Sequence, residues 1–197
     1  MFTALLDTCV LWPSLQRDFL LSLAVEGMYR PVWSAVILEE LEYEETAKLV
    51  KRGCTVAEAE RRASHLIEQM RAAFGDAEVD GWEGLEGTYG LPDPDDEHVL
   101  AATVVAGAGA IVTDNMKHFP QPELPTGIEA ISPAEFAANT VAVDPIRARV
   151  AVASIATRSG RKGPHLTPIF AQRIGPESHV PPPATQGPPT MSITTPL

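Results

Sequence analysis

Cysteine is scarce in this chain, and so are long apolar runs. The 197 residues include only Cys9 and Cys54, too few and too unpatterned for a disulfide framework or a cysteine-based zinc site. No apolar run is long enough to span a bilayer, and the N-terminus lacks the basic region and cleavable apolar core of a secretory signal. We therefore expect a protein without a membrane segment in a reducing, cytoplasmic setting.

Positive charge is also in short supply. Lys and Arg number 15 against 26 Asp and Glu, which gives a formal net charge of −11. A basic face supplies most non-specific affinity for nucleic acid, so this charge argues against simple electrostatic binding of nucleic acid. A divalent metal in an acidic pocket would change the local sign. The composition therefore permits a nuclease without indicating one.

The length fits one main domain with a core of its own, which we place at residues 1–141. Asp144-Pro145 can start one more helix, so we expect a C-terminal helical extension over 142–160. Residues 164–197 hold half of the chain's 18 prolines and little periodic apolar content. Such composition is typical of disorder, and we predict a Pro-rich disordered tail over 161–197.

Two short apolar runs each end in an acid. The run from Phe2 to Leu6 predicts a strand buried on both faces of a parallel sheet, with Asp7 at its carboxyl end. Residues 110–113 repeat the pattern, and Asp114 follows them. Residues 127–131 are a further strand candidate, and the alternation of strands with helices from 95 to 140 predicts an α/β fold with right-handed crossovers.

Other segments are less regular or purely helical. Residues 29–33 contain Pro31 and predict a weak strand or a connector. Ser34 and Thr55 are good N-caps for two successive helices, which a short turn should join into an antiparallel hairpin.

Five acids lie on segments that could converge. Asp7 and Asp114 follow strands, Glu40 lies on an early helix, and Asp93 and Asp96 precede the helix expected from residue 97. Magnesium and manganese prefer such oxygen ligands. Gathered carboxylates repel one another without a cation, whereas with one they can hold ions that activate water and stabilise a phosphoryl group. We predict Asp7 as the first ligand of a divalent metal in a nuclease.

Each residue has an ordinary alternative role. Asp7 could simply begin a turn, Glu40 is one of several glutamates on its helix, and Asp93 and Asp96 could serve a turn and a helix N-terminus. The histidines are scattered and fit surface positions better than ligand positions: His65, His98 and His118. Only the joint occurrence of the acids favours a nuclease.

Five segments together resemble the PIN-domain family, in particular the VapC-type ribonuclease toxins of prokaryotic toxin–antitoxin pairs. In the family's order they are LLDTCVL (5–11), ILEEL (37–41), LPDPDDEHVLAA (91–102), IVTDNMKHFP (111–120) and ISPAEF (131–136). The resemblance covers about residues 2–140. It implies a three-layer α/β/α sandwich with a central, mostly parallel sheet, and an endoribonuclease that depends on Mg²⁺ or Mn²⁺.

The resemblance also implies roles for individual residues. Asp7, Glu40 and Asp96 match the family's first three acids, with Asp93 as a neighbouring metal ligand and Asp114 as the fourth acid. Supporting positions are Thr8, Thr113 and Asn115.

Two positions depart from the family's pattern. Cys9 stands where many members have Asn, which could weaken support for the first acid's loop. In Thr113-Asp114-Asn115, Asn occupies the usual acid position and the acid comes one residue earlier. A related subgroup carries Asn there, so either Asp114 or Asn115 completes the site.

The implied partners are an RNA substrate, a cognate antitoxin whose peptide occupies the groove, and a second copy of the chain bound through the first helices. A catalytically inactive PIN-like protein that binds RNA or a partner protein is the alternative. A phosphohydrolase with Asp7 as nucleophile is a weaker one, because that chemistry usually places a second acid where this chain has Cys9.

Overall fold

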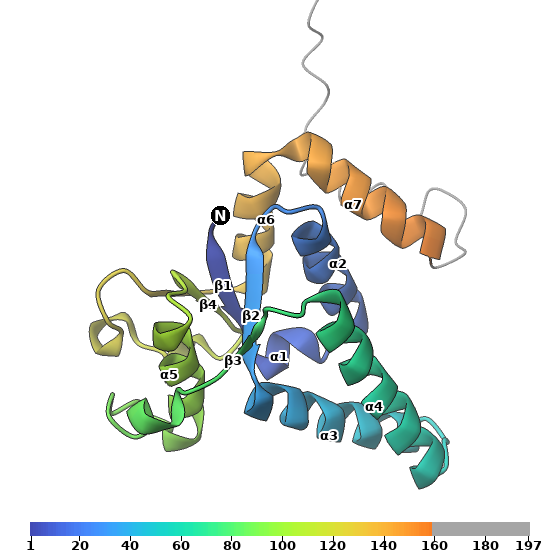
Figure 1. Ribbon diagram of the computed structural model, residues 1–197, viewed down its shortest axis with the longest axis horizontal. Coiled ribbons are helices and arrows are strands. Elements are labelled where there is room, and N and C mark those ends of the chain that lie inside the picture. The colour runs from blue at the N-terminus through green and yellow to red at the C-terminus, as the bar shows by residue number, and fades with distance from the viewer. Residues whose placement is uncertain (159–197) are drawn as a thin grey trace, which may run out of the picture.

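The structure is a computed structural model that describes residues 1–158 (Figure 1). The tail expected over 161–197, and the last two residues of the expected helical extension, lie outside the described residues. None of the described helices combines the length and apolar character needed to cross a membrane.

A five-stranded parallel sheet forms the centre of the fold, in the order β3-β2-β1-β4-β5. The strands are β1 (Thr3–Leu6), β2 (Arg30–Ser34), β3 (Glu78–Val79), β4 (Ala110–Val112) and β5 (Glu129–Ile131). All four pairings are parallel. Strand β1 lies in the middle, and its Ala4, Leu5 and Leu6 are fully buried, as its unbroken apolar run predicts.

The segment 29–33, for which the sequence favours a weak strand or connector, is an internal strand that pairs with both β1 and β3. Alternate N–H groups of a strand point to opposite neighbours. The N–H groups of Arg30 and Trp33 donate to Phe2 and Ala77, so the missing N–H of Pro31 falls on the β3 side. Strand β3 pairs only with the last two residues of β2 there, so proline costs the sheet no hydrogen bond.

Within residues 1–158, seven α-helices connect and cover the strands. They are α1 (Thr8–Leu11), α2 (Ser14–Val25), α3 (Ala35–Lys51), α4 (Val56–Ala73), α5 (Glu97–Val105), α6 (Pro133–Val143) and α7 (Pro145–Arg158). The expected caps are present, since Ser34 and Thr55 accept hydrogen bonds from the N–H groups of Ile37 and Glu58. Helices α3 and α4 pack together as the predicted hairpin.

The helices make the outer layers of an α/β/α sandwich. Figure 1 shows α5 on one side of the sheet and α2 and α6 on the other, with α7 outside them against α2. Helix α5 packs on β1, β2 and β4. The fold class expected from the sequence is therefore confirmed.

A buried cluster of charges joins α2 to α3. The Glu45 carboxylate of α3 pairs with Lys48 and lies 3.7 Å from Nη1 of Arg17 on α2. The two cations also donate to the carbonyls of Leu11 and Trp12, and all three charged side chains are about one-tenth exposed. The cluster fixes the start of α2 against the helix that carries Glu40.

Replacing Glu45 tests the strength of this cluster. We expect Glu45→Ala to lower the free energy of unfolding by about 3 kcal/mol, because it leaves two largely buried cations without their anion. Urea unfolding measures the change. The exposed Glu58–Arg61 pair on α4 is the control, and Glu58→Ala should cost less than about 1 kcal/mol. Equal effects of the two substitutions would contradict the assignment.

Candidate metal centre

The order of the strands places a topological switch point at the carboxyl ends of β1 and β4. Strand β2 lies on one side of β1, and β4 lies on the other side. The connections from β1 and from β4 therefore lead in opposite directions across the sheet, and the switch point lies between β1 and β4. Open α/β sheets bind ligands at such a switch point. Asp7 follows β1 and Thr113 follows β4, which brings them to this edge as the sequence predicts.

Asp7 is held firmly at the edge. Its carboxylate is 5% exposed, and Oδ2 accepts hydrogen bonds from Thr113 Oγ1 at 2.6 Å and from Cys9 Sγ at 3.1 Å. Its backbone N–H donates to the Val112 carbonyl at 3.1 Å. The bonds to the side chain all use Oδ2, so β4 and the first turn of α1 set the orientation of this carboxylate.

Cys9 supports Asp7 in the position where asparagine is common in the resembled family. Its Sγ accepts a hydrogen bond from the N–H of Asp114 at 3.3 Å as well as donating to Asp7. Burial, followed by the charge of Asp7, raises the pKa of the thiol to about 12. The thiol is therefore protonated at neutral pH and can act as a donor. Cys9, in place of the asparagine common in the resembled family, thus still makes a direct contact with Asp7.

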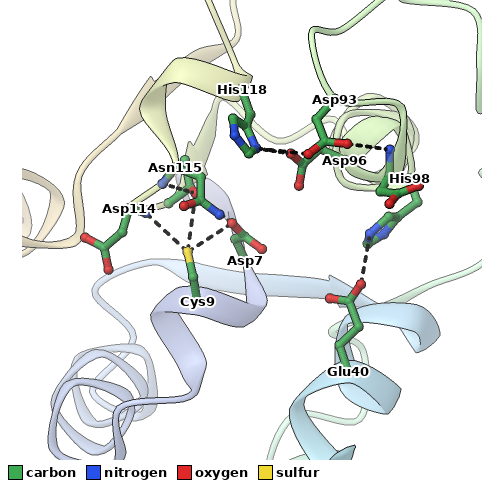
Figure 2. A network of polar contacts seen from close by, with 11 residues as sticks. Asp7, Cys9, Glu40, Asp93, Asp96, His98, Asp114, Asn115 and His118 are labelled. Carbon is green, nitrogen blue, oxygen red and sulfur yellow. Dashed lines mark hydrogen bonds and ion pairs between the residues drawn. The ribbon is translucent and has the colours of Figure 1, made fainter. Parts of the chain in front are cut away.

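A second group of polar side chains lies near Asp7: Asp93 and Asp96 come from the start of α5, and His118 from the turn after β4 (Figure 2). His118 Nδ1 lies 2.5 Å from Asp96 Oδ2 and 3.6 Å from Asp93 Oδ2. The ligand atoms of these three residues all lie within 4.8 Å of one another. Asp93 also accepts the N–H of Asp95 at its other oxygen, which fixes the turn that begins the helix.

The pKa of Asp96 lies above its ordinary value. Burial raises this pKa most, the hydrogen bond from His118 opposes the rise, and the charges of Asp7 and Asp93 add to it. The ionised forms of Asp7 and Asp96 therefore repel each other, and a cation between them would relieve that repulsion.

Glu40 approaches the same region from α3. Its Oε2 accepts a hydrogen bond from Thr8, and its Oε1 lies 3.5 Å from His98 Nε2. Burial raises the pKa of Glu40, but the bonds from His98 and Thr8 outweigh burial and leave the pKa below its ordinary value. Figure 2 shows Glu40 beneath the start of α5, on the far side of Asp7 from Asp114.

The two candidates for the fourth position differ in direction. Asp114 is exposed, and Figure 2 shows its carboxylate directed away from Asp7. Asn115 is partly buried, and its side chain lies on the side of Asp7. The backbone N–H of Asn115 donates to Thr113 Oγ1 at 2.9 Å. The Thr113 hydroxyl therefore contacts both the backbone of Asn115 and the carboxylate of Asp7.

Two histidines that the sequence predicts at the surface lie beside the acids in the structure. His98 is 5% exposed and contacts Glu40, and His118 contacts Asp96. Their signal was position: His98 comes two residues after Asp96 at the start of a helix, and His118 comes five residues after Thr113 beyond a strand end. His65 is exposed on α4, as expected.

The residues at this edge fit a divalent metal ion. Asp93 and Asp96 at the start of α5 converge with one nitrogen of His118, and both ligand types bind divalent cations. Asp7 at the end of β1 lies near enough for its charge to act on Asp96. Fold and site thus define an α/β protein with a cluster of acids and one histidine, a candidate metal site, at the carboxyl edge of its sheet.

Comparison with known protein families identifies the family of this chain. Residues 3–117, more than half of the chain, match the PIN domain, and the chain belongs to the PIN-domain family. PIN domains are in general metal-dependent nucleases. No curated protein and no solved structure matches the chain.

Glu97 fixes the segment that carries Asp93. It is 3% exposed, and its two oxygens accept the backbone N–H groups of Leu91 at 2.9 Å and Tyr89 at 3.0 Å. Burial raises the pKa of Glu97, but the backbone donors together outweigh burial, and the pKa lies below its ordinary value of 4.5. The ionised carboxylate is thus the form that holds the acidic turn.

This shift predicts a pH-dependent contribution to stability. Because the folded-state pKa is depressed, the contribution is complete above 4.5 and is lost as pH falls through the folded pKa. We expect Glu97→Gln to lower the unfolding free energy by about 2 kcal/mol at pH 7, with a difference that shrinks below pH 4.5. Urea unfolding from pH 7 to pH 3 measures it. A difference that does not change with pH would refute this role.

Proposed function

We propose that this chain is an endoribonuclease that hydrolyses phosphodiester bonds of cytoplasmic RNA with Mg²⁺ or Mn²⁺ as cofactor. Asp7, Asp93 and Asp96 would hold the metal. The observation that carries the proposal is the convergence of Asp7 with Asp96, whose pKa rises through burial and through the charges of Asp7 and Asp93. Membership of the PIN-domain family supports a nuclease, and the acidic centre supports the metal.

The protein residues prepare the centre in different ways. Thr113 and Cys9 hold Asp7 through Oδ2 and so set which way its carboxylate faces. Glu40 has a lowered pKa and a half-exposed carboxylate, so at neutral pH it is ionised and open to solvent. There it can accept a hydrogen bond from the attacking water and orient it. A bound divalent ion would supply activation of that water and stabilisation of charge on the phosphoryl group.

For the fourth position we propose Asn115, in preference to Asp114. The partial burial of Asn115 and its direction toward Asp7 support this choice. The carboxylate of Asp114 contributes negative charge at the rim. Lys117 is exposed in the same segment and could contact an RNA phosphate.

Conservative substitutions of the acids test the nuclease. We expect Asp7→Asn and Asp96→Asn each to lower the rate of single-stranded RNA cleavage by about 100-fold or more, because each removes a charge that holds the metal. The exposed Asp95 of the same turn supplies the matched control, and Asp95→Asn should keep the wild-type rate.

Two outcomes would count against this proposal. Full activity in both Asp7→Asn and Asp96→Asn would exclude the centre as the place of cleavage. RNA binding by the wild type without cleavage in Mn²⁺ would instead favour the catalytically inactive alternative, in which the changed fourth position has cost the site its activity.

We further propose that the chain is the toxin of a toxin–antitoxin pair. The resemblance of its five motifs to VapC-type toxins supports this role. The cognate antitoxin would place a segment against the acids at the carboxyl edge of the sheet. Arginine or lysine side chains of that segment could pair there with Asp93 and Asp96. Such a segment would block the metal centre while bound.

A homodimer through the first helices completes the proposal. Leu15 of α2 is 56% exposed and Tyr43 of α3 is 73% exposed, although both are large apolar or aromatic residues. Trp12 is also exposed and donates a hydrogen bond to the Glu44 carbonyl, which ties the start of α2 to the same part of α3. These side chains support a contact surface on α2 and α3.

The mass of the protein in solution tests the dimer. We expect a dimer for the wild type and a monomer for Leu15→Glu, because a charge in an apolar contact is costly to bury. Light scattering after size-exclusion chromatography measures the mass. Val143→Glu changes an even more exposed apolar residue at the end of α6 and should leave the dimer intact. A monomeric wild type would refute the proposal.

A further inference from the structure

His118 occupies a rigid position beside the acids. It ends the short helical turn Met116–His118, where its N–H donates to the Asn115 carbonyl at 2.9 Å. The next residue, Phe119, is 2% exposed and anchors the turn in the core. The imidazole therefore does not depend on a flexible loop for its approach to Asp93 and Asp96.

The spacing of the atoms suits shared coordination of one ion. His118 Nδ1 is 2.5 Å from Asp96 Oδ2 and 3.6 Å from Asp93 Oδ2. Ligand atoms in neighbouring positions around a six-coordinate divalent ion lie about 3 Å apart. The two observed separations fall on either side of that value, and all three ligand atoms lie within 4.8 Å of one another, which is near the spacing of one coordination sphere.

A nitrogen ligand changes which ion the site favours. Mg²⁺ prefers oxygen ligands and keeps much of its water shell. Imidazole is instead a good ligand for first-row transition ions, whose affinity for mixed nitrogen and oxygen sites exceeds that of Mg²⁺.

We propose that His118 Nδ1 is a metal ligand together with Asp93 and Asp96, and that the centre therefore selects a divalent first-row transition ion over Mg²⁺. This inference rests on the metal centre of the proposed function. It goes further by assigning the nitrogen ligand and the class of ion.

Metal binding by the full chain tests the assignment without any RNA. Calorimetry gives the affinities for Mn²⁺ and for Mg²⁺ in the wild type, His118→Asn, His65→Asn and Asp96→Asn. His118→Asn is the decisive variant, because asparagine can still hydrogen-bond to Asp96 but offers an oxygen where the imidazole offered a nitrogen. His65→Asn makes the same change at an exposed histidine of α4.

We expect the ratio of Mn²⁺ to Mg²⁺ affinity to fall by about 10-fold or more in His118→Asn and to stay unchanged in His65→Asn. Pulsed electron paramagnetic resonance adds a spectroscopic readout. Nitrogen hyperfine coupling to bound Mn²⁺ should appear in the wild type and vanish in His118→Asn. Thermal unfolding of each variant confirms that the fold is retained.

The possible failures are distinguishable. If His118→Asn keeps the wild-type affinity ratio and the nitrogen coupling, while Asp96→Asn loses binding, the histidine assignment is wrong and the proposed metal centre stands. If the wild type does not bind either ion, or if Asp96→Asn binds both as the wild type does, the proposed centre and the histidine assignment fail together.

Discussion

The hydrogen bond from Thr113 to Asp7 is the contact on which the centre depends. It joins the ends of the two middle strands at the point where the chain reverses direction through the sheet, and both residues are buried. Cys9 and the backbone of Asp114 extend the contact into one network. Asp96 at the start of α5 lies near Asp7 held in this way, and its pKa is raised by burial and, to a smaller extent, by the charge of Asp7.

Much of the fold follows from local patterns in the sequence. The unbroken apolar run of β1 and the N-caps Ser34 and Thr55 have the roles that their positions predict, and Asp93 accepts a hydrogen bond in the turn before α5. For the segment 29–33 the sequence predicts only a weak strand or a connector, because proline argues against an internal strand. Only the strand pairing shows that the missing N–H of Pro31 faces β3, which pairs with β2 only at Trp33 and Ser34 and so requires no hydrogen bond from Pro31.

Less of the centre could be predicted, because it depends on distances between segments far apart in the chain. Motif resemblance located Asp7, Glu40, Asp93 and Asp96, and the fold brings them to one edge. The position of His118 beyond a strand end is a weak local signal, and it does not show the contact with Asp96, which lies 22 residues away along the chain. The sequence also could not show in which directions the side chains of Asp114 and Asn115 point after β4.

The central claim is that acids from the end of β1 and from the start of α5 share one divalent ion. Anomalous diffraction from crystals grown with Mn²⁺ tests it most directly, because the signal locates the ion without assumptions about activity. The account predicts a peak within about 2.5 Å of carboxylate oxygens of both Asp7 and Asp96. A peak elsewhere on the protein, or no peak at full Mn²⁺ saturation, would contradict it.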